Sequence, residues 1–214
     1  MFNLVPAWAI HYEEFWLTVR SRNLWFIKLR YTAVVMLLFF IIFPKYFLEI
    51  NFADEQQFAL LIITFSILVY NITFHYLRQF VKLDADKFNP LHLSILQMIF
   101  DLTALMLIVY FTGSVESPLL LFFVIHMIVG SLILPGFVIY TFAIVIVLAF
   151  WGITVGEYYS LIPHHHVSGF LSFSLHQQFN YVLAINVSFA FFFFFIVLIA
   201  NRMANQLYIR EQQL

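Results

Sequence analysis

Long apolar stretches restrict the possible folds of this chain more than any other feature, because each is close to the approximately 20 residues that a helix needs to cross a bilayer. Only 10% of the 214 residues are charged, against about 25% in soluble domains. The sequence therefore predicts an all-α integral membrane protein with six transmembrane helices. The predicted spans are Phe26–Phe47, Gln57–Leu77, Leu91–Thr112, Pro118–Leu134, Phe137–Tyr159 and Phe179–Asn201.

The basic residues predict the orientation of these spans. Nine of the ten Lys and Arg residues precede the apolar run of the first span, lie between spans two and three, or follow span six. With six spans these three segments share one side of the membrane, and the positive-inside rule assigns that side to the cytoplasm. Both termini are therefore predicted to be cytoplasmic, with Lys45 alone on the opposite side.

Three regions follow from this pattern. Residues 1–25 mix Trp with charged side chains and are predicted to be a cytoplasmic or interfacial amphipathic leader. Residues 26–201 form the six-helix membrane domain. Residues 202–214 contain no helix breaker and are predicted to begin a cytoplasmic linker helix or coiled coil. A last span that runs directly into a cytoplasmic helix is expected of a membrane sensor, and the end of the chain within that helix suggests a following output domain.

Two ionisable residues, Asp101 and His126, lie near the middle of predicted spans, where they are costly and mark candidate functional sites. Asp101 precedes the connection between spans three and four, and His126 follows it, at depths of roughly 16 and 12 Å. We therefore expect Asp101 and His126 to meet inside the helix bundle and to relieve each other's desolvation. Gln97 lies one turn before Asp101 on the same helix face, so it joins this candidate pocket.

The predicted outer loop between spans five and six is rich in histidine. His164, His165, His166 and His176 could bind Zn²⁺ or Cu²⁺ through neutral imidazoles. Adjacent residues rarely all face one ion, however, and no Cys or acidic ligand lies within this loop. The sequence therefore favours a solvated loop over an ordered metal site. Haem ligation, copper binding and a small proton-coupled transporter that uses Asp101 and His126 remain alternatives.

The short connection between spans three and four has its own local signals. Gly113 can adopt a positive φ, Ser117 is a candidate N-cap, and Pro118 suits the first position of the next helix. Free N–H groups at a helix start can bind a carbonyl or an anionic group. Thr112, Gly113, Ser117 and Pro118 are therefore candidate ligand-binding residues.

Several motifs carry a resemblance to a known family. They are Asp101-Leu102-Thr103, Leu107-Ile108-Val109-Tyr110-Phe111-Thr112-Gly113, Ser117-Pro118-Leu119 and Ile133-Leu134-Pro135. Together they resemble the six-helix sensor region of RegB/PrrB-type redox-sensing histidine kinases. In that family an outer loop of pattern Gly-Gly-x-x-Asn-Pro-Phe is implicated in sensing ubiquinone. This chain has Ser114, Ser117 and Leu119 at the positions of the second Gly, the Asn and the Phe.

The resemblance implies the membrane input module of a two-component histidine kinase in the bacterial inner membrane. A quinone-like ligand would bind near Gly113, Ser117 and Pro118. The implied partners are membrane lipid, a second copy in a homodimer, and a downstream kinase domain with its response regulator; no nucleic acid partner is expected. The chain contains no phosphoacceptor segment or ATP-binding motif, so it is not expected to be an enzyme by itself.

Overall fold

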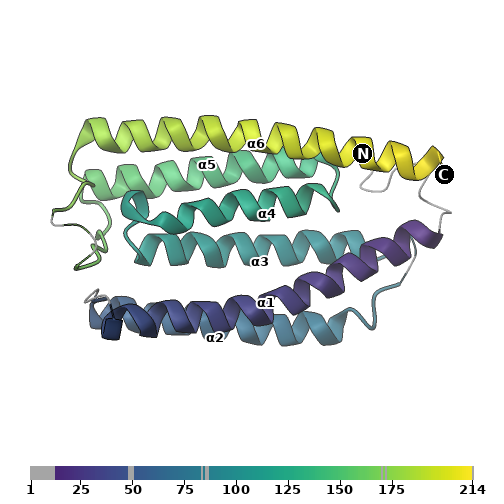
Figure 1. Cartoon of the computed structure of the whole chain (residues 1–214), viewed down its shortest axis with the longest axis horizontal. Helices are drawn as coiled ribbons and strands as arrows, with labels where there is room; N and C mark the ends of the chain where they lie inside the picture. Colours follow the sequence, from purple (N-terminus) through teal and green to yellow (C-terminus); the bar gives the residue numbers. More distant parts are fainter. Residues whose placement is uncertain are drawn as a thin grey trace.

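A computed structural model describes residues 13–47, 51–82, 84, 87–169, 171 and 173–213. These residues form an all-α bundle in which the helices run side by side and the chain reverses direction at each connection (Figure 1). The helices are α1 (Glu13–Phe47), α2 (Asp54–Leu77), α3 (Pro90–Phe111), the 3₁₀ helices η2 (Ser114–Glu116) and η3 (Pro118–Leu120), α4 (Leu121–Ser131), α5 (Gly136–Tyr158) and α6 (Phe179–Gln213).

Five of these helices are long and apolar enough to cross a membrane: α1, α2, α3, α5 and α6. The prediction of an all-α, multi-span membrane protein is therefore confirmed. The predicted fourth span is shorter than expected, because it consists of η3 followed by only 11 residues of α4. At 1.5 Å per residue α4 covers about 16 Å, against a hydrocarbon core of about 30 Å. Length and composition thus identify five membrane-span candidates rather than six.

The helices form two groups of three. α1, α2 and α3 contact one another, while α4 and α5 each contact α6 and also contact each other. α3 joins the groups through its contacts with α4 and α5. Figure 1 shows α1 and α2 on one side of the bundle and α5 and α6 on the other, with α3 and α4 between them.

The two ends of the bundle differ in charge. We name the end where α1 begins and α6 ends the basic end, on the right of Figure 1. By the bounds of the helices, it includes Arg20, Arg22, Arg78, Lys82, Lys87 and Arg202. The opposite end, which we name the acidic end, includes Asp54, Glu55, Glu116 and Glu157. The basic segments thus share one end, as the charge pattern predicts.

The first helix starts earlier than the predicted first span. α1 begins at Glu13, and the side chains of Phe15, Trp16 and Val19 are buried in the same apolar cluster as residues of α3 to α6. Arg22 donates a hydrogen bond to the backbone oxygen of Leu132, between α4 and α5. Residues 13–25 therefore pack as part of the bundle, whereas residues 1–12 of the predicted leader lie outside the described residues.

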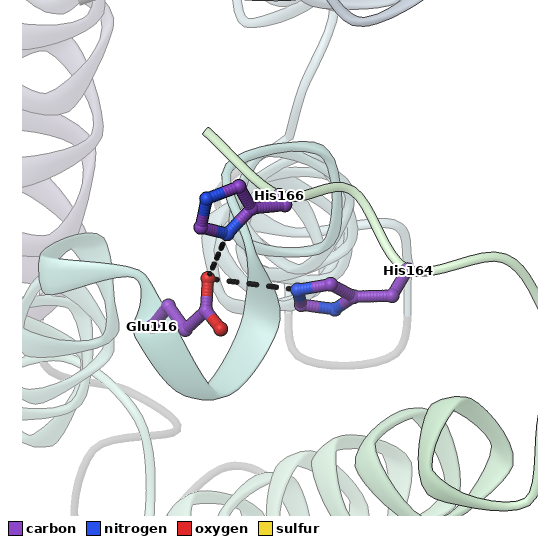
Figure 2. Close-up of side chains that lie close together, drawn as sticks. All are labelled: Glu116, His164 and His166. Atoms are coloured by element: carbon purple, nitrogen blue, oxygen red, sulfur yellow. Dashed lines mark hydrogen bonds and ion pairs between the residues drawn. The ribbon is translucent and has the colours of Figure 1, made fainter. Parts of the chain in front are cut away.

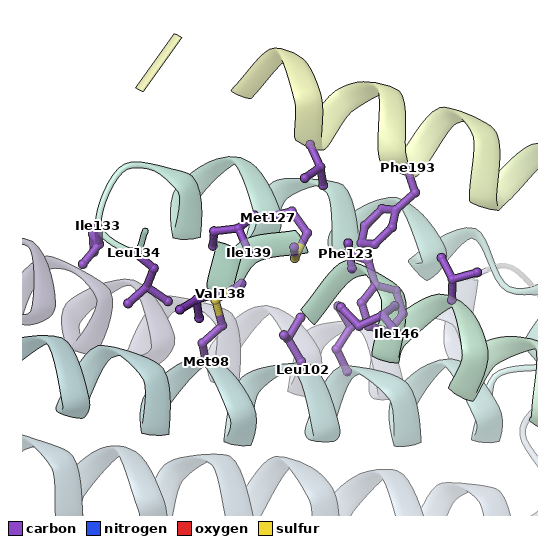
Figure 3. Packing of buried hydrophobic residues seen from close by; sticks show 14 of the residues in the cluster. Met98, Leu102, Phe123, Met127, Ile133, Leu134, Val138, Ile139, Ile146 and Phe193 are labelled. Carbon is purple, nitrogen blue, oxygen red and sulfur yellow. The ribbon is translucent and has the colours of Figure 1, made fainter. Parts of the chain in front are cut away.

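The short helix α4 lies at the centre of the largest apolar cluster (Figure 3). Phe123 and Met127 of α4 are fully buried against Ile139 of α5 and Phe193 of α6. Gly130 permits close approach to α3, since a Cβ atom at this position would lie 2.7 Å from Cε of Met98. Tight packing of this kind stabilises helix association in lipid, where burial of apolar surface between helices contributes little.

Candidate functional site

A buried ion pair lies midway along the bundle between α1 and α3. Nε of Arg30 donates to both carboxylate oxygens of Asp101, at 2.7 and 2.9 Å, and Nη2 donates to Oδ2 at 2.8 Å. The side chains are only 8% and 14% exposed. An unpaired charge is very costly in an apolar environment, so each of these residues depends on the other.

Three further polar side chains, those of Tyr70, Asn71 and Gln97, contact this ion pair. Together with Arg30 and Asp101 they form what we name the central cluster. The hydroxyl of Tyr70 donates to Oδ1 of Asp101 at 2.8 Å. Arg30 also donates to Oδ1 of Asn71 at 3.2 Å and to Oε1 of Gln97 at 2.9 Å. The cluster therefore joins α1, α2 and α3 through side-chain hydrogen bonds at one depth.

The predicted pairing of Asp101 with His126 is wrong. Asp101 bonds Arg30 and Tyr70, while Nδ1 of His126 lies 2.8 Å from the backbone oxygen of Phe122 in its own helix. The prediction failed because Arg30 was assigned to the basic segment that precedes the first span. Its position within the predicted span Phe26–Phe47 was the available signal, since a cation inside the membrane needs a buried partner. Gln97 does lie in one polar cluster with Asp101, as the spacing of four residues predicts, since both accept hydrogen bonds from Nη2 of Arg30.

A second polar cluster lies at the acidic end, where three segments distant in sequence meet. We name it the acidic-end cluster; it consists of Ser114, Glu116, Glu157, His164, His166, Ser174 and His176. Figure 2 shows the side chains of His164 and His166 pointing toward Glu116 of η2. Nδ1 of His166 lies 2.9 Å from Oε2 of Glu116, and Nε2 of His164 lies 3.5 Å from the same oxygen.

The other oxygen of Glu116 holds the segment that leads into α6. Oε1 accepts hydrogen bonds from the backbone N–H of Leu175 at 2.6 Å and from the hydroxyl of Ser174 at 3.2 Å. Burial alone would raise the pKa of the Glu116 carboxyl. The hydrogen bonds from Leu175 and His166, with the nearby imidazole of His164, instead lower this pKa below its ordinary value. Glu116 therefore stays ionised and links the α3–α4 connection to the start of α6.

Glu157, near the end of α5, is a second buried carboxylate in this cluster. Its Oε1 accepts a hydrogen bond of 2.8 Å from the hydroxyl of Ser114, whereas Oε2 has no hydrogen-bond partner among the described residues. Ser114 is held at φ +46°, a left-handed conformation that is uncommon for residues other than glycine. The bond to Glu157 fixes the Ser114 side chain in this position.

His164 lies between the two carboxylates. Its Nδ1 is 3.3 Å from Oε1 of Glu157, and its side chain is 6% exposed. Neither ring nitrogen makes an aligned hydrogen bond with a described residue. Burial alone would lower the pKa of His164, but the carboxylates of Glu157 and Glu116 raise it above the ordinary value. The His164 side chain is therefore buried between two carboxylates, and neither of its ring nitrogens has a hydrogen-bond partner among the described residues.

The two remaining histidines of the loop have other roles. The ring of His165 packs against Tyr110 and Phe111, with centroids 4.8 and 4.7 Å away. His176 stacks on His164 at 4.0 Å, and its Nδ1 lies 2.6 Å from the hydroxyl of Ser174. Of the four histidines considered as metal ligands, only His164 and His166 face Glu116. The histidine loop contains no acidic residue, and the carboxylate that faces its histidines is that of Glu116 in the α3–α4 connection.

The α3–α4 connection has the local conformation that its sequence predicts. Gly113 has φ +103°, and Pro118 occupies the first turn of η3. The Ser117 hydroxyl caps this turn by accepting from the N–H of Leu119 at 3.3 Å. The hydroxyl of Thr112 donates to the oxygen of Ile108 and lies 2.7 Å from that of Ser117. Both hydroxyl groups, predicted as ligand contacts, are therefore hydrogen-bonded within the loop or to the last turn of α3.

Comparison with known proteins leaves these two clusters to be interpreted on their geometry. No family model, no curated protein and no solved structure matches the chain.

Proposed function

We propose that this chain is the membrane input module of a dimeric sensor histidine kinase in the bacterial cytoplasmic membrane. In this proposal a quinone-like lipophilic ligand changes the packing of the helices near the acidic end. The change passes along α6 to a kinase domain at the basic end. A ligand has this effect only if it favours one packing of the helices over another.

The observation that carries the proposal is the length and continuity of α6. Its 35 residues form one helix from Phe179 to Gln213, which at 1.5 Å per residue is about 52 Å. The hydrocarbon core accounts for about 30 Å of that length. The helix begins three residues after His176, directly behind the acidic-end cluster. A displacement at this cluster would therefore be transmitted to the far end of α6 without an intervening loop.

The arrangement of the other helices supports the same direction of transmission. The central cluster links α1, α2 and α3, whereas α6 packs against α4 and α5. In this proposal one group moves against the other where α3 contacts α4 and α5 and where the start of α1 packs on the α4–α6 group. We also propose that α4 is a sixth crossing, because it runs along the bundle between α3 and α5 toward the basic end (Figure 1). Both termini would then be cytoplasmic.

The backbone conformation of the α3–α4 connection supports a quinone as the ligand. Gly113 and Ser114 are both left-handed, at φ +103° and +46°, where the RegB/PrrB-type loop has two glycines. The protons of the Thr112 and Ser117 hydroxyls are engaged within the loop. A quinone carbonyl that binds here would exchange one of these hydrogen bonds for its own. This exchange would couple ligand binding to the conformation of the loop.

The movement of α6 can be measured directly, because the chain contains no cysteine. Spin labels at the exposed positions Phe80 and Met203 would report the distance between the end of α2 and the distal part of α6. In nanodiscs containing a short-chain ubiquinone, we expect the Phe80–Met203 distance distribution to differ between oxidised and reduced quinone. Double electron–electron resonance measures this distance.

A matched pair of labels at Trp25 and Phe80 lies within the α1–α3 group and should keep one distribution in both redox states. The Ser117→Ala variant should lose the redox response of the Phe80–Met203 pair, since it lacks the hydroxyl that the quinone engages. Identical Phe80–Met203 distributions with oxidised and reduced quinone would overturn the proposed function.

A further inference from the structure

We propose that Glu116, His164 and His166 form a binding site for a divalent transition metal ion of the Zn²⁺ type. The three side chains each offer one ligand atom, and these atoms all lie within 4.8 Å of one another. Two imidazole nitrogens and a carboxylate oxygen are donors that Zn²⁺ and related ions prefer. The inference concerns ion binding alone and does not depend on the sensor function.

The spacing of the ligand atoms suits one ion. Two donors at about 2.05 Å from a tetrahedral ion lie about 3.3 Å apart. Oε2 of Glu116 is 2.9 Å from Nδ1 of His166 and 3.5 Å from Nε2 of His164. These two separations fall on either side of the expected value. An ion can therefore be bound with small side-chain adjustments, and Figure 2 shows ring nitrogens of His164 and His166 directed toward Oε2 of Glu116.

The groups behind these ligands resemble the outer shell of a metal site. A histidine that binds a metal usually donates its second ring N–H to a carboxylate, which fixes its orientation. Nδ1 of His164 faces Oε1 of Glu157 at 3.3 Å, and Glu157 is held in turn by Ser114. The second oxygen of Glu116 accepts from the N–H of Leu175. The Leu175 N–H thus orients Glu116, whereas Glu157 lies close to Nδ1 of His164 without an aligned hydrogen bond.

The unsatisfied polar atoms of the site are a second, independent observation. Both ring nitrogens of the buried His164 lack a hydrogen-bond partner among the described residues, as does Oε2 of Glu157. Such atoms are rare in folded proteins, because each one carries the cost of its lost hydration. Nε2 of His164 points to the space that it shares with Glu116, where coordination would satisfy it.

Charge balance also favours a dication. Glu116 and Glu157 are buried carboxylates whose ion pairs within the described part of the chain involve only His164 and His166. Imidazoles that bind a metal ion are neutral, so the charge of a divalent ion bound here would be offset by the two carboxylates. His166 is 31% exposed, so an ion can enter from solution. Three protein ligands also leave a coordination position for water.

The proposal is tested with the full chain, purified through a tag without histidine and treated with a chelator. Titration calorimetry with Zn²⁺, checked by elemental analysis after gel filtration, should give about one ion per chain. Glu116→Gln and His166→Gln should each weaken binding by about 100-fold or more. Glu157→Gln, which removes an outer partner, should weaken it by about 10–100-fold.

His165→Gln is the matched control, because His165 lies between the two ligand histidines but packs on Tyr110 and Phe111. It should bind Zn²⁺ like the wild type. The His166 side chain is partly exposed, so His166→Gln is expected to fold and tests the site even if Glu116→Gln does not fold. The visible spectrum of bound Co²⁺ should change in the two ligand variants and not in the control. Absence of stoichiometric Zn²⁺ binding, or equal loss in His165→Gln and His166→Gln, would overturn the proposal.

Discussion

Asp101→Asn is expected to destabilise the bundle by about 3–5 kcal/mol, because it leaves the charge of Arg30 buried without a counter-ion. Asn has nearly the shape of Asp, so the packing around it is preserved and the effect reports the lost charge. Tyr70, Asn71 and Gln97 cannot compensate, since they are uncharged. The free energy of unfolding, measured by titration with a denaturing detergent, would show the loss.

The double variant Arg30→Met with Asp101→Leu tests the cause of that loss. Replacing both members of a buried ion pair by apolar residues is often neutral or stabilising. We therefore expect the double variant to recover most of the stability lost by Asp101→Asn. Lys28→Met removes an exposed cation two residues before Arg30, on another face of α1, and should have little effect. A double variant less stable than Asp101→Asn would show that the polar contacts, rather than the charges, hold α1 to α3.

Phe123→Ala is expected to destabilise the protein by about 3–5 kcal/mol, the usual range for removal of a buried aromatic side chain. The Phe123 side chain is 0% exposed and lies against α6, where its ring centroid is 6.2 Å from that of Phe189. The truncation leaves a cavity at the centre of the α4–α6 group. The same detergent titration measures the effect.

Phe122, the neighbour of Phe123, is the control residue, because its side chain is 46% exposed on the outer surface of α4. Phe122→Ala leaves no cavity and exchanges contacts with lipid alone, so its stability should stay within about 0.5 kcal/mol of the wild type. Equal losses in the two variants would mean that α4 does not use Phe123 to anchor itself in the bundle.

The sequence predicts those features of the fold that depend on residues close to one another along the chain. The apolar runs locate the helices, Gly113 and Ser117 shape the α3–α4 connection, and the spacing of Gln97 and Asp101 places both on one face of α3. Helical periodicity and turn chemistry are local, so they are readable without the fold. The short length of α4 is less readable, because an apolar run does not show where 3₁₀ geometry replaces the α-helix.

The partners of the charged residues depend on how distant segments pack. Arg30 reaches Asp101 because α1 starts at Glu13, which puts Arg30 near the middle of that helix rather than at its end. Glu116 meets His166 across 50 positions of sequence, through two loops that only the assembled bundle brings together. Spacing within the histidine loop could not reveal this carboxylate. The cost of a buried charge shows that a partner is required but does not identify it.

In the proposed sensor, α6 connects an outward-facing acidic end to a cytoplasmic basic end, and α4 crosses the membrane. Single cysteines in this cysteine-free chain can be labelled with a membrane-impermeant maleimide in intact cells. Three exposed positions are suitable: Ser168 at the acidic end, Gln79 after α2 and Leu132 between α4 and α5. Ser168→Cys should react in intact cells, whereas Gln79→Cys and Leu132→Cys should react only after permeabilisation. Reaction of Leu132→Cys from outside, or protection of Ser168→Cys, would contradict the account.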